Sequence, residues 1–238
     1  MRLLVCSLLL LFACGSGPAL ARDELVTSAR TPTGETIPYI LTSKDGTPRY
    51  AVILMPGGAG HLDPRMQDGK LVFASGGNFL IRSRELFADG SFVAASTDAT
   101  STPARVMAIV QDLESRYGKI AVYLIGTSRS TEATMALSKP LDGLVAGFVH
   151  TSSMNSIASF DARNFKSRHL IVHHDKDVCR VTRLSASESS HKSYGTELIV
   201  VEGGTSVGDD CEAYAHHGYN GVEKATVDKI KAWVANAK

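Results

Sequence analysis

Ala121-Val-Tyr-Leu-Ile-Gly-Thr-Ser-Arg-Ser130 is the stretch of this chain that decides its fold. Its apolar, β-branched half predicts a buried strand, and the residues that follow, Thr131–Leu137, predict a helix. A strand that turns sharply into a helix places Ser128 on a tight corner, with its hydroxyl exposed and the N–H of Arg129 directed into the same space. This geometry suits a nucleophilic serine. The simpler alternative is a serine-rich loop in which Ser128 or Ser130 caps the helix.

The pentapeptide Gly126-Thr-Ser-Arg-Ser130 resembles the nucleophile elbow, Gly-x-Ser-x-Gly, of the α/β-hydrolase superfamily. The chain looks most like the small carboxylesterases and dienelactone hydrolases that lack a lid. One departure is Ser130, which stands where the family usually has glycine. The resemblance covers about Tyr50 to Lys238 and implies a three-layer α/β/α sandwich with a mostly parallel sheet and no large cap domain. It also implies that Ser128 is the nucleophile.

A glycine-rich loop, Pro56-Gly-Gly-Ala-Gly-His61, follows the continuous apolar run Ala51–Met55. Glycines after a buried strand let the backbone approach another group closely. In the superfamily this loop supplies half of the oxyanion hole, so the resemblance implies that the N–H of Gly58 or Ala59 acts together with that of Arg129. The Gly-Lys-Ser/Thr ending of a phosphate-binding loop is absent, and a simple flexible turn is the remaining alternative.

Apolar runs alternate with segments of helical periodicity along the rest of the chain. This alternation predicts a parallel sheet covered on both faces, with the functional site beyond the carboxyl ends of its strands. The expected strands span residues 36–41, 50–55, 92–96, 120–125, 144–149, 169–174 and 196–201, and the expected helices span residues 78–87, 103–118, 131–137 and 222–237. We expect residues 22–30 to be a polar, loosely held start, residues 71–74 to be a short strand or packed loop, and His150 to be a structural loop histidine.

An acidic loop follows the predicted strand 169–174. In the superfamily, a His-Gly pair at this place is followed after two residues by the catalytic aspartate. On His173-His174 this resemblance assigns the acid to Asp177, with Asp175 as the alternative. His174 stands where glycine is usual, which is a second departure from the family pattern.

A histidine pair, His216-His217, lies in the loop between the last predicted strand and the last helix, where an α/β-hydrolase keeps its base. The sequence His-Gly-aromatic before that helix resembles the family segment and selects His217 over His216. The alternative is an exposed loop histidine. The order Ser128, Asp177, His217 matches the serine, acid, histidine order of the superfamily.

Three other side chains are candidates for substrate binding: His61, Asn78 and Arg82. His61 closes the glycine-rich loop, and Asn78 and Arg82 belong to the predicted helix 78–87. For Arg82 and its neighbour Arg84 a solvated helix face is the simpler interpretation. Arg129 favours an anionic substrate or forms a structural salt bridge.

The chain has four cysteines, of which Cys6 and Cys14 lie in an N-terminal segment that predicts a secretory signal. Arg2, the apolar run 3–12 and Ala19-Leu-Ala21 predict cleavage after residue 21, leaving residues 22–238 as a single domain exported to the periplasm or beyond. Lipidation at Cys14 is the alternative that ranks second.

The remaining cysteines, Cys179 and Cys211, predict a disulfide because an isolated pair in an oxidising compartment most simply forms one. This bond would join the acid loop to the histidine loop. Two alternatives remain, which are unconnected buried thiols and a structural zinc site that combines both cysteines with His173 and His217.

A formal net charge of +1 on 238 residues gives no reason to expect nucleic acid or an anionic membrane as a partner. The sequence therefore predicts an exported serine hydrolase that cleaves a small-molecule ester with Ser128, His217 and Asp177, without metal or organic cofactor. A peptidase or amidase with the same triad, and a non-catalytic binding or envelope protein on the same scaffold, are the alternatives. The sequence does not determine the oligomeric state.

Overall fold

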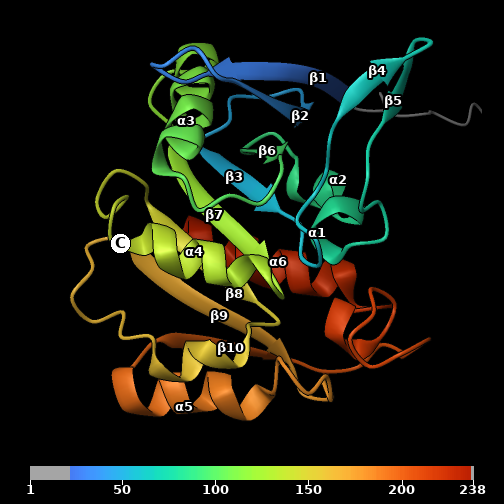
Figure 1. Cartoon of the computed structure of the whole chain (residues 1–238), viewed down its shortest axis with the longest axis vertical. Helices are drawn as coiled ribbons and strands as arrows, with labels where there is room; N and C mark the ends of the chain where they lie inside the picture. The colour runs from blue at the N-terminus through green and yellow to red at the C-terminus, as the bar shows by residue number, and fades with distance from the viewer. Residues whose placement is uncertain (1–21, 237–238) are drawn as a thin grey trace, which may run out of the picture.

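An eight-stranded sheet crosses the computed structural model, which describes residues 22–236 (Figure 1). Its strand order is β1-β2-β6-β3-β7-β8-β9-β10. β1 and β2 are antiparallel to their neighbours, and the six strands from β6 to β10 are parallel to one another. The strands are β1 (Arg22–Arg30), β2 (Thr36–Lys44), β3 (Tyr50–Met55), β6 (Phe92–Ser96), β7 (Ala121–Thr127), β8 (Gly147–Thr151), β9 (Arg168–His174) and β10 (Glu197–Val201).

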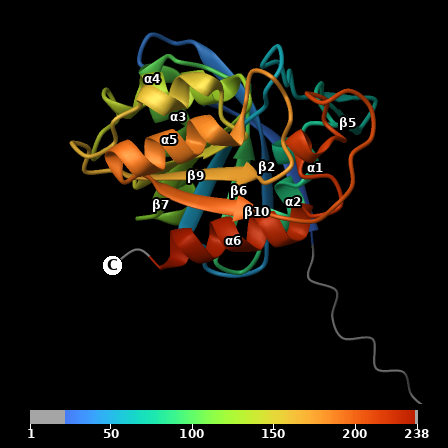
Figure 2. The ribbon, with the colours of Figure 1, turned by 90° about the horizontal axis from the view of Figure 1, so that it is seen from below.

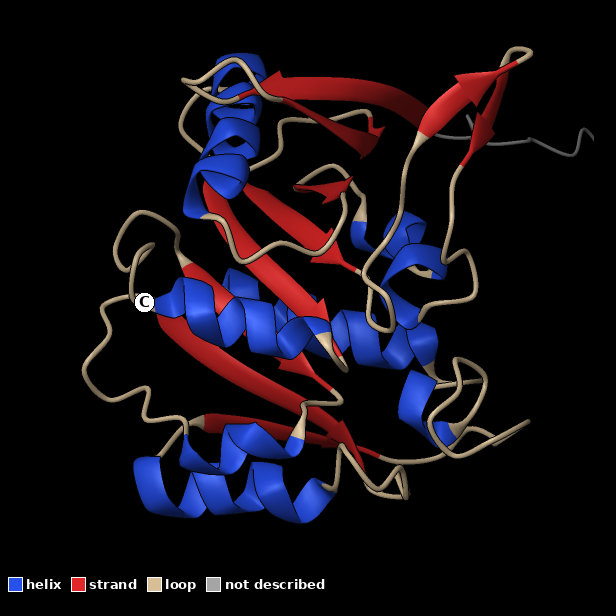
Figure 3. Cartoon of the chain, in the orientation of Figure 1, coloured by secondary structure: helices blue, strands red, loops and turns tan. Residues whose placement is uncertain are grey.

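Helices cover both faces of this sheet, as the view from below shows (Figure 2). α3 (Pro103–Tyr117), α4 (Ser130–Ser138) and α5 (Leu184–Tyr194) lie on one face. α1 (Phe79–Arg82), α2 (Arg84–Phe87) and α6 (Glu223–Ala235) lie on the other. Two 3-10 helices, η1 (Asn155–Ser159) and η2 (His216–Gly218), and a small hairpin of β4 (Arg65–Gln67) and β5 (Lys70–Val72) complete the chain (Figure 3).

The central strands are buried on both faces, which explains why their sequences are continuous apolar runs. In β7, Val122 and Leu124 pack in the core under α3 and α4, whereas Tyr123 and Ile125 pack in the core under α6. The predicted three-layer architecture with a mostly parallel sheet is confirmed. The carboxyl ends of β3, β7 and β9 lie on the same side of the sheet (Figure 1), and predicted site residues follow each of them in the sequence.

The prediction of a loosely held start at residues 22–30 is wrong, because these residues form β1, which pairs with β2 along its whole length. The strand lies at the sheet's edge, which accommodates its polar residues. Glu24 accepts hydrogen bonds from Arg84 at 2.7 Å and from Thr42 at 3.1 Å, and Ala29 is buried. Ion pairs and ladder bonds thus order a segment that has few apolar side chains.

Two further segments differ from expectation. The predicted helix 78–87 is two short helices, because the backbone turns at Ser83 between α1 and α2. His150 is not a loop histidine: it lies within β8, which begins and ends later than predicted, and its side chain is fully buried. Of residues 71–74, Leu71 and Val72 belong to β5, one of the two interpretations of that segment.

Residues 22–236 include no helix long and apolar enough to cross a membrane. The predicted signal sequence, its cleavage site and the alternative lipidation at Cys14 lie outside the described residues.

Candidate active site

Ser128 occupies the corner between β7 and α4 with a φ of 54°, a left-handed conformation that a non-glycine residue adopts only under strong local constraint. Two glycines make this corner possible. A Cβ on Gly126 would lie 2.7 Å from the carbonyl oxygen of Ser130, and a Cβ on Gly57 would lie 2.7 Å from that of Thr127. The sharp corner predicted from the sequence is therefore present, and it requires close backbone contacts on both sides.

Ser130, the departure from the family pattern, fixes the corner from inside. Its buried hydroxyl accepts a hydrogen bond from the N–H of Thr127 at 2.8 Å. The same oxygen lies 2.8 Å from the carbonyl of Met55 and 3.0 Å from that of Thr127, to which it can donate. The Ser130 side chain thus joins the carboxyl end of β7 to that of β3, a contact that glycine cannot make.

The candidate acid and base are in direct contact. His217 Nδ1 lies 3.0 Å from Oδ2 of Asp177, and both side chains are buried. Oδ1 of Asp177 accepts the N–H of Cys179 at 3.0 Å. Burial alone would raise the pKa of the Asp177 carboxyl, but hydrogen bonds from His173 and His217 outweigh burial and lower this pKa to about 2. The Asp177 side chain is consequently an anion at neutral pH.

This contact determines the tautomer of His217. A carboxylate accepts hydrogen bonds and cannot donate them, so the proton of the neutral imidazole lies on Nδ1. Nε2 is then left with a free lone pair, as a general base requires.

The alternative acid and the alternative base both contact His174 instead of the candidate triad. Asp175 contacts Nδ1 of His174 at 3.0 Å, and the His216 ring stacks on His174 at 4.7 Å between centroids.

The histidine loop is held on both sides of His217. Ser152 donates its hydroxyl to the carbonyl of His217 at 2.6 Å. The Tyr219 hydroxyl donates to the Val172 carbonyl of β9 at 2.8 Å and accepts the N–H of Ser152 at 2.9 Å. A Cβ on Gly218 would lie 1.9 Å from the carbonyl oxygen of Ala213, which explains the glycine of the His-Gly-aromatic segment.

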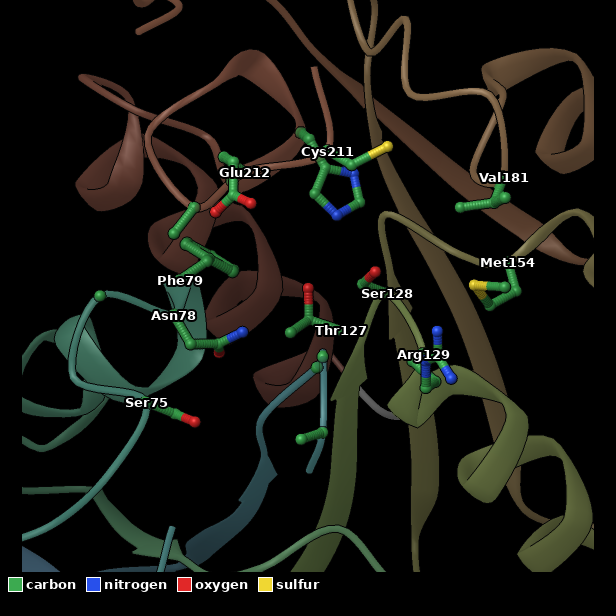
Figure 4. Close-up of a pocket in the computed structure, with 17 residues that line it drawn as sticks. Ser75, Asn78, Phe79, Thr127, Ser128, Arg129, Met154, Val181, Cys211 and Glu212 are labelled. Carbon is green, nitrogen blue, oxygen red and sulfur yellow. The ribbon is translucent and has the colours of Figure 1, made fainter. Parts of the chain in front are cut away.

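A cavity of about 480 Å³ opens over Ser128 and is lined by the oxyanion candidates Gly58, Ala59 and Arg129 and by His217 (Figure 4). In the described chain, the backbone N–H groups of Gly58, Ala59 and Arg129 donate no hydrogen bond. These donors are therefore available to an oxygen atom in the cavity, and the choice between Gly58 and Ala59 stays open.

The three predicted substrate-binding residues have different places. Asn78 lines the cavity, where its side-chain oxygen also caps α1 by accepting the N–H of Leu80 at 3.1 Å. Arg82 lies outside the lining and is paired with Glu223 at 2.9 Å. Its guanidinium also donates to the Gly218 carbonyl at 2.6 Å, so it holds the histidine loop. His61 is exposed and lies outside the lining as well.

The predicted disulfide between Cys179 and Cys211 is present. It joins the loop of Asp177 to the loop of His217, and Cys211 lines the cavity. Ligand atoms of Asp177, Cys179 and His217 lie within 4.8 Å of one another. The sulfur of Cys179 is bonded to that of Cys211, however, so neither cysteine can supply the thiolate that a zinc site needs. The residues present do not fit the zinc alternative.

Sequence reasoning missed two residues that contact the candidate triad. Thr182 Oγ1 lies 3.2 Å from Oδ2 of Asp177 and 3.1 Å from Nδ1 of His217. His173 Nε2 lies 3.2 Å from the same oxygen of Asp177. No motif signals Thr182, and His173 served only to locate the acid loop and as a zinc alternative.

The sequence matches no protein-family model and no curated protein. Its fold is similar to that of many solved structures, and three of them illustrate the similarity. A serine hydrolase without a lid from Xanthomonas campestris shares 9% identity at a TM-score of 0.56, over 90% of this chain and 98% of the other. A cold-adapted esterase from an Arctic intertidal metagenomic library shares 15% identity at a TM-score of 0.60, over 94% of this chain and 99% of the other. A serine hydrolase homologue from Coxiella burnetii shares 12% identity at a TM-score of 0.56, over 92% of this chain and 98% of the other.

At these identities the similarity establishes the fold. The chain has the α/β-hydrolase fold without a lid, and the resemblance predicted from the elbow sequence is confirmed at that level.

Proposed function

We propose that the protein is an exported serine hydrolase that cleaves carboxylic esters with Ser128, His217 and Asp177. One observation carries the proposal: a serine in a left-handed corner shares a cavity with a histidine whose Nδ1 contacts a buried aspartate. A serine hydroxyl is a weak nucleophile until a base takes its proton, and a histidine held by a carboxylate is such a base.

In the proposed reaction His217 Nε2 takes the proton of Ser128 as Oγ attacks the ester carbonyl. Asp177 stabilises the imidazolium that forms, without taking up the proton itself. His217 then gives this proton to the leaving alcohol, and an acyl group remains on Ser128. His217 then takes a proton from water as the water attacks the acyl-enzyme, and returns it to Ser128 Oγ as the acid leaves.

The negative charge on the carbonyl oxygen is stabilised by the N–H of Arg129 together with that of Gly58 or Ala59. Support comes from the free state of these donors and from their place in the cavity lining. Removing one donor of this kind typically costs about a hundred- to a thousandfold in rate. The remaining lining includes Phe79, Met154 and Val181, apolar side chains that suit a hydrocarbon group of an ester (Figure 4).

A fluorophosphonate probe tests the activated serine directly. We expect the mature chain from Arg22 to be labelled, and the variants Ser128→Ala and His217→Ala to remain unlabelled. Ser75→Ala is the matched control, because Ser75 lines the same cavity but donates its hydroxyl to the His61 carbonyl. This variant should still be labelled. A folded wild-type chain that takes up no label would overturn the proposal in favour of a non-catalytic binding protein.

Ester preference is tested with p-nitrophenyl acetate and the p-nitroanilide of the same acid. We expect hydrolysis of the ester and little of the anilide. The reverse order would favour the peptidase or amidase alternative. Export is tested separately, by sequencing the N-terminus of the protein recovered outside the cytoplasm, which should begin at Arg22.

A further inference from the structure

We propose that His173 is a positioning residue of the catalytic site, which fixes the carboxylate of Asp177 against His217. The inference rests on the proposed function, because it assigns His173 a part in the same reaction. His173 lies in β9, four residues before Asp177, and its side chain is fully buried.

The His173 ring makes polar contacts through both nitrogen atoms. Nε2 lies 2.7 Å from the carbonyl oxygen of Thr182 and 3.2 Å from Oδ2 of Asp177. Nδ1 lies 2.8 Å from the hydroxyl of Ser187 in α5. The ring therefore connects the acid, the loop that follows it and the helix that covers this end of β9.

The chemistry of these partners fixes the position of every proton. A carbonyl oxygen and a carboxylate oxygen are both acceptors, so Nε2 of His173 carries the proton. Nδ1 is then an acceptor, and Ser187 donates its hydroxyl to it. The two acceptors at Nε2 exclude the other tautomer, and the Ser187 hydroxyl holds the ring through Nδ1.

Oδ2 of Asp177 accordingly has three donors around it. His217 Nδ1 lies at 3.0 Å, and the Thr182 hydroxyl and His173 Nε2 each lie at 3.2 Å. The contacts of His173 and Thr182 with Oδ2 restrict rotation of the carboxylate. The carboxylate can then meet His217 in one orientation, both before and after His217 is protonated.

Burial argues that the polar ring has a purpose beyond packing. A buried polar group costs free energy unless all its hydrogen bonds are made, and an apolar side chain would fill this place on β9 without that cost. The next residue, His174, shows the contrast. It bonds the carbonyl of Gly203 and the N–H of Lys176, outside the triad.

Two amide substitutions separate the two ends of the ring. His173→Gln reaches the place of Nε2 and keeps a donor toward Asp177. His173→Asn reaches only the place of Nδ1 and keeps only the contact with Ser187. For hydrolysis of p-nitrophenyl acetate we expect His173→Asn to lower kcat about tenfold with KM unchanged, the scale typical when a partner behind a functional group is removed. His173→Gln should stay within about threefold of wild type.

Equal kcat values for the two amide variants would overturn the positioning role, whether both are impaired or both resemble wild type. Circular dichroism and intact disulfide content establish that each variant is folded. If either does not fold, Ser187→Ala is the second test: it keeps the ring but removes the hydroxyl that holds Nδ1, and should lower kcat about threefold with KM unchanged. An unchanged kcat in Ser187→Ala would then overturn the inference.

The two proposals fail in distinguishable ways. A wild-type chain that neither takes up fluorophosphonate nor hydrolyses the ester overturns both. A wild-type chain that does both, with an unaltered kcat in His173→Asn, overturns only the role of His173.

Discussion

At the scale of single residues, the corner at Ser128 shows how a side chain replaces a backbone preference. The family pattern has glycine where this chain has Ser130, and a larger residue would be expected to crowd the turn. Instead the Ser130 hydroxyl lies among three backbone polar groups of β3 and β7. The departure therefore contributes hydrogen bonds to the corner rather than strain.

This contact predicts that restoring the family residue is harmful. Ser130→Gly removes the buried hydroxyl and its hydrogen bonds to Thr127 and Met55, and it adds backbone freedom at the first residue of α4. We expect the free energy of unfolding to fall by about 1–3 kcal/mol. Urea denaturation of Ser130→Gly, Ser130→Ala and wild type measures the loss. A glycine variant as stable as wild type would contradict the interpretation.

A second prediction at this scale concerns the charge on Asp177. Its pKa of about 2 means that the carboxylate is ionised throughout the working range of an esterase. Asp177→Asn keeps the size of the side chain but allows its amide to donate to Nδ1 of His217, which favours the wrong tautomer. We expect kcat to fall by on the order of 10⁴, as in other triads. Steady-state kinetics measure this fall, and a loss below about tenfold would remove Asp177 from the triad.

The residues that sequence reasoning found and missed differ in a physical way. The placement of Ser128 and His217 at one cavity, with Asp177 against His217, was predictable because each follows a strand at a spacing the superfamily shares. Thr182 and His173 were not, because their contact with Asp177 arises from how the acid loop folds back over β9. Arg82 was a candidate for substrate binding, with a solvated helix face as the simpler interpretation, but its partners Glu223 and the Gly218 carbonyl are distant in sequence.

At the scale of elements, the site depends on two loops that follow β9 and β10 and have little regular structure. Residues 202–214 of the histidine loop, which joins β10 to α6, are mostly exposed. A hydrogen bond from Ser152 holds it at His217, one from Arg82 holds it at Gly218, and the disulfide holds it at Cys211. Exposed loops with few buried contacts open readily unless they are tied in this way.

We therefore predict that the disulfide matters for activity as well as stability. The double variant Cys179→Ala/Cys211→Ala loses a link across 32 residues, which corresponds to about 3–4 kcal/mol in the chain-entropy model. We also expect slower fluorophosphonate labelling, since Asp177 and His217 are less well fixed. Thermal unfolding and labelling rates measure the two effects. Dithiothreitol should reproduce them in wild type and leave the double variant unchanged. A response of the double variant to dithiothreitol would show that the effect of the reductant does not arise from this disulfide.

Element types in the chain were largely predictable, and the errors have local causes. β1 lacks an apolar run because it is an edge strand whose order comes from pairing with β2 and from the Arg84–Glu24 ion pair. β8 extends to Thr151 because His150 is buried by partners distant in sequence, such as Thr134. Neither partner is visible in a local window of sequence.

At the scale of the whole molecule, the candidate site and a buried pair of histidines lie in different parts of the fold. The parallel sheet brings the carboxyl ends of β3, β7 and β9 to one edge, where the candidate site lies (Figure 3). On the α4 face, away from that cavity, a second group of ionisable side chains is enclosed. His150 and His169 lie side by side, with 3.2 Å between Nε2 of the first and Nδ1 of the second. They are packed against Phe148 and Phe160.

Burial makes this histidine pair a source of acid sensitivity. Burial lowers the pKa of His150 well below its usual value, and the neighbouring His169 lowers it further. Burial lowers the pKa of His169 to about 4, although the charge of Asp142 opposes the shift. Both histidines are thus neutral in the folded chain and take up protons near pH 6.5 when it unfolds. The unfolded chain binds more protons between about pH 6.5 and 4, so stability falls as pH falls through this window.

For His169 alone the lowered pKa corresponds to a loss of about 3 kcal/mol in the free energy of unfolding between neutral pH and pH 4. Urea midpoints measured from pH 7.5 to 4.5 with the disulfide intact should decline most steeply below pH 6.5. His169→Phe keeps a ring against Phe148 but has no proton to gain, and it leaves His150 without one hydrogen bond. We expect this variant to be less stable than wild type at pH 7.5 and to lose less stability on acidification. Parallel pH profiles for the two proteins would show that acid sensitivity arises outside the buried pair.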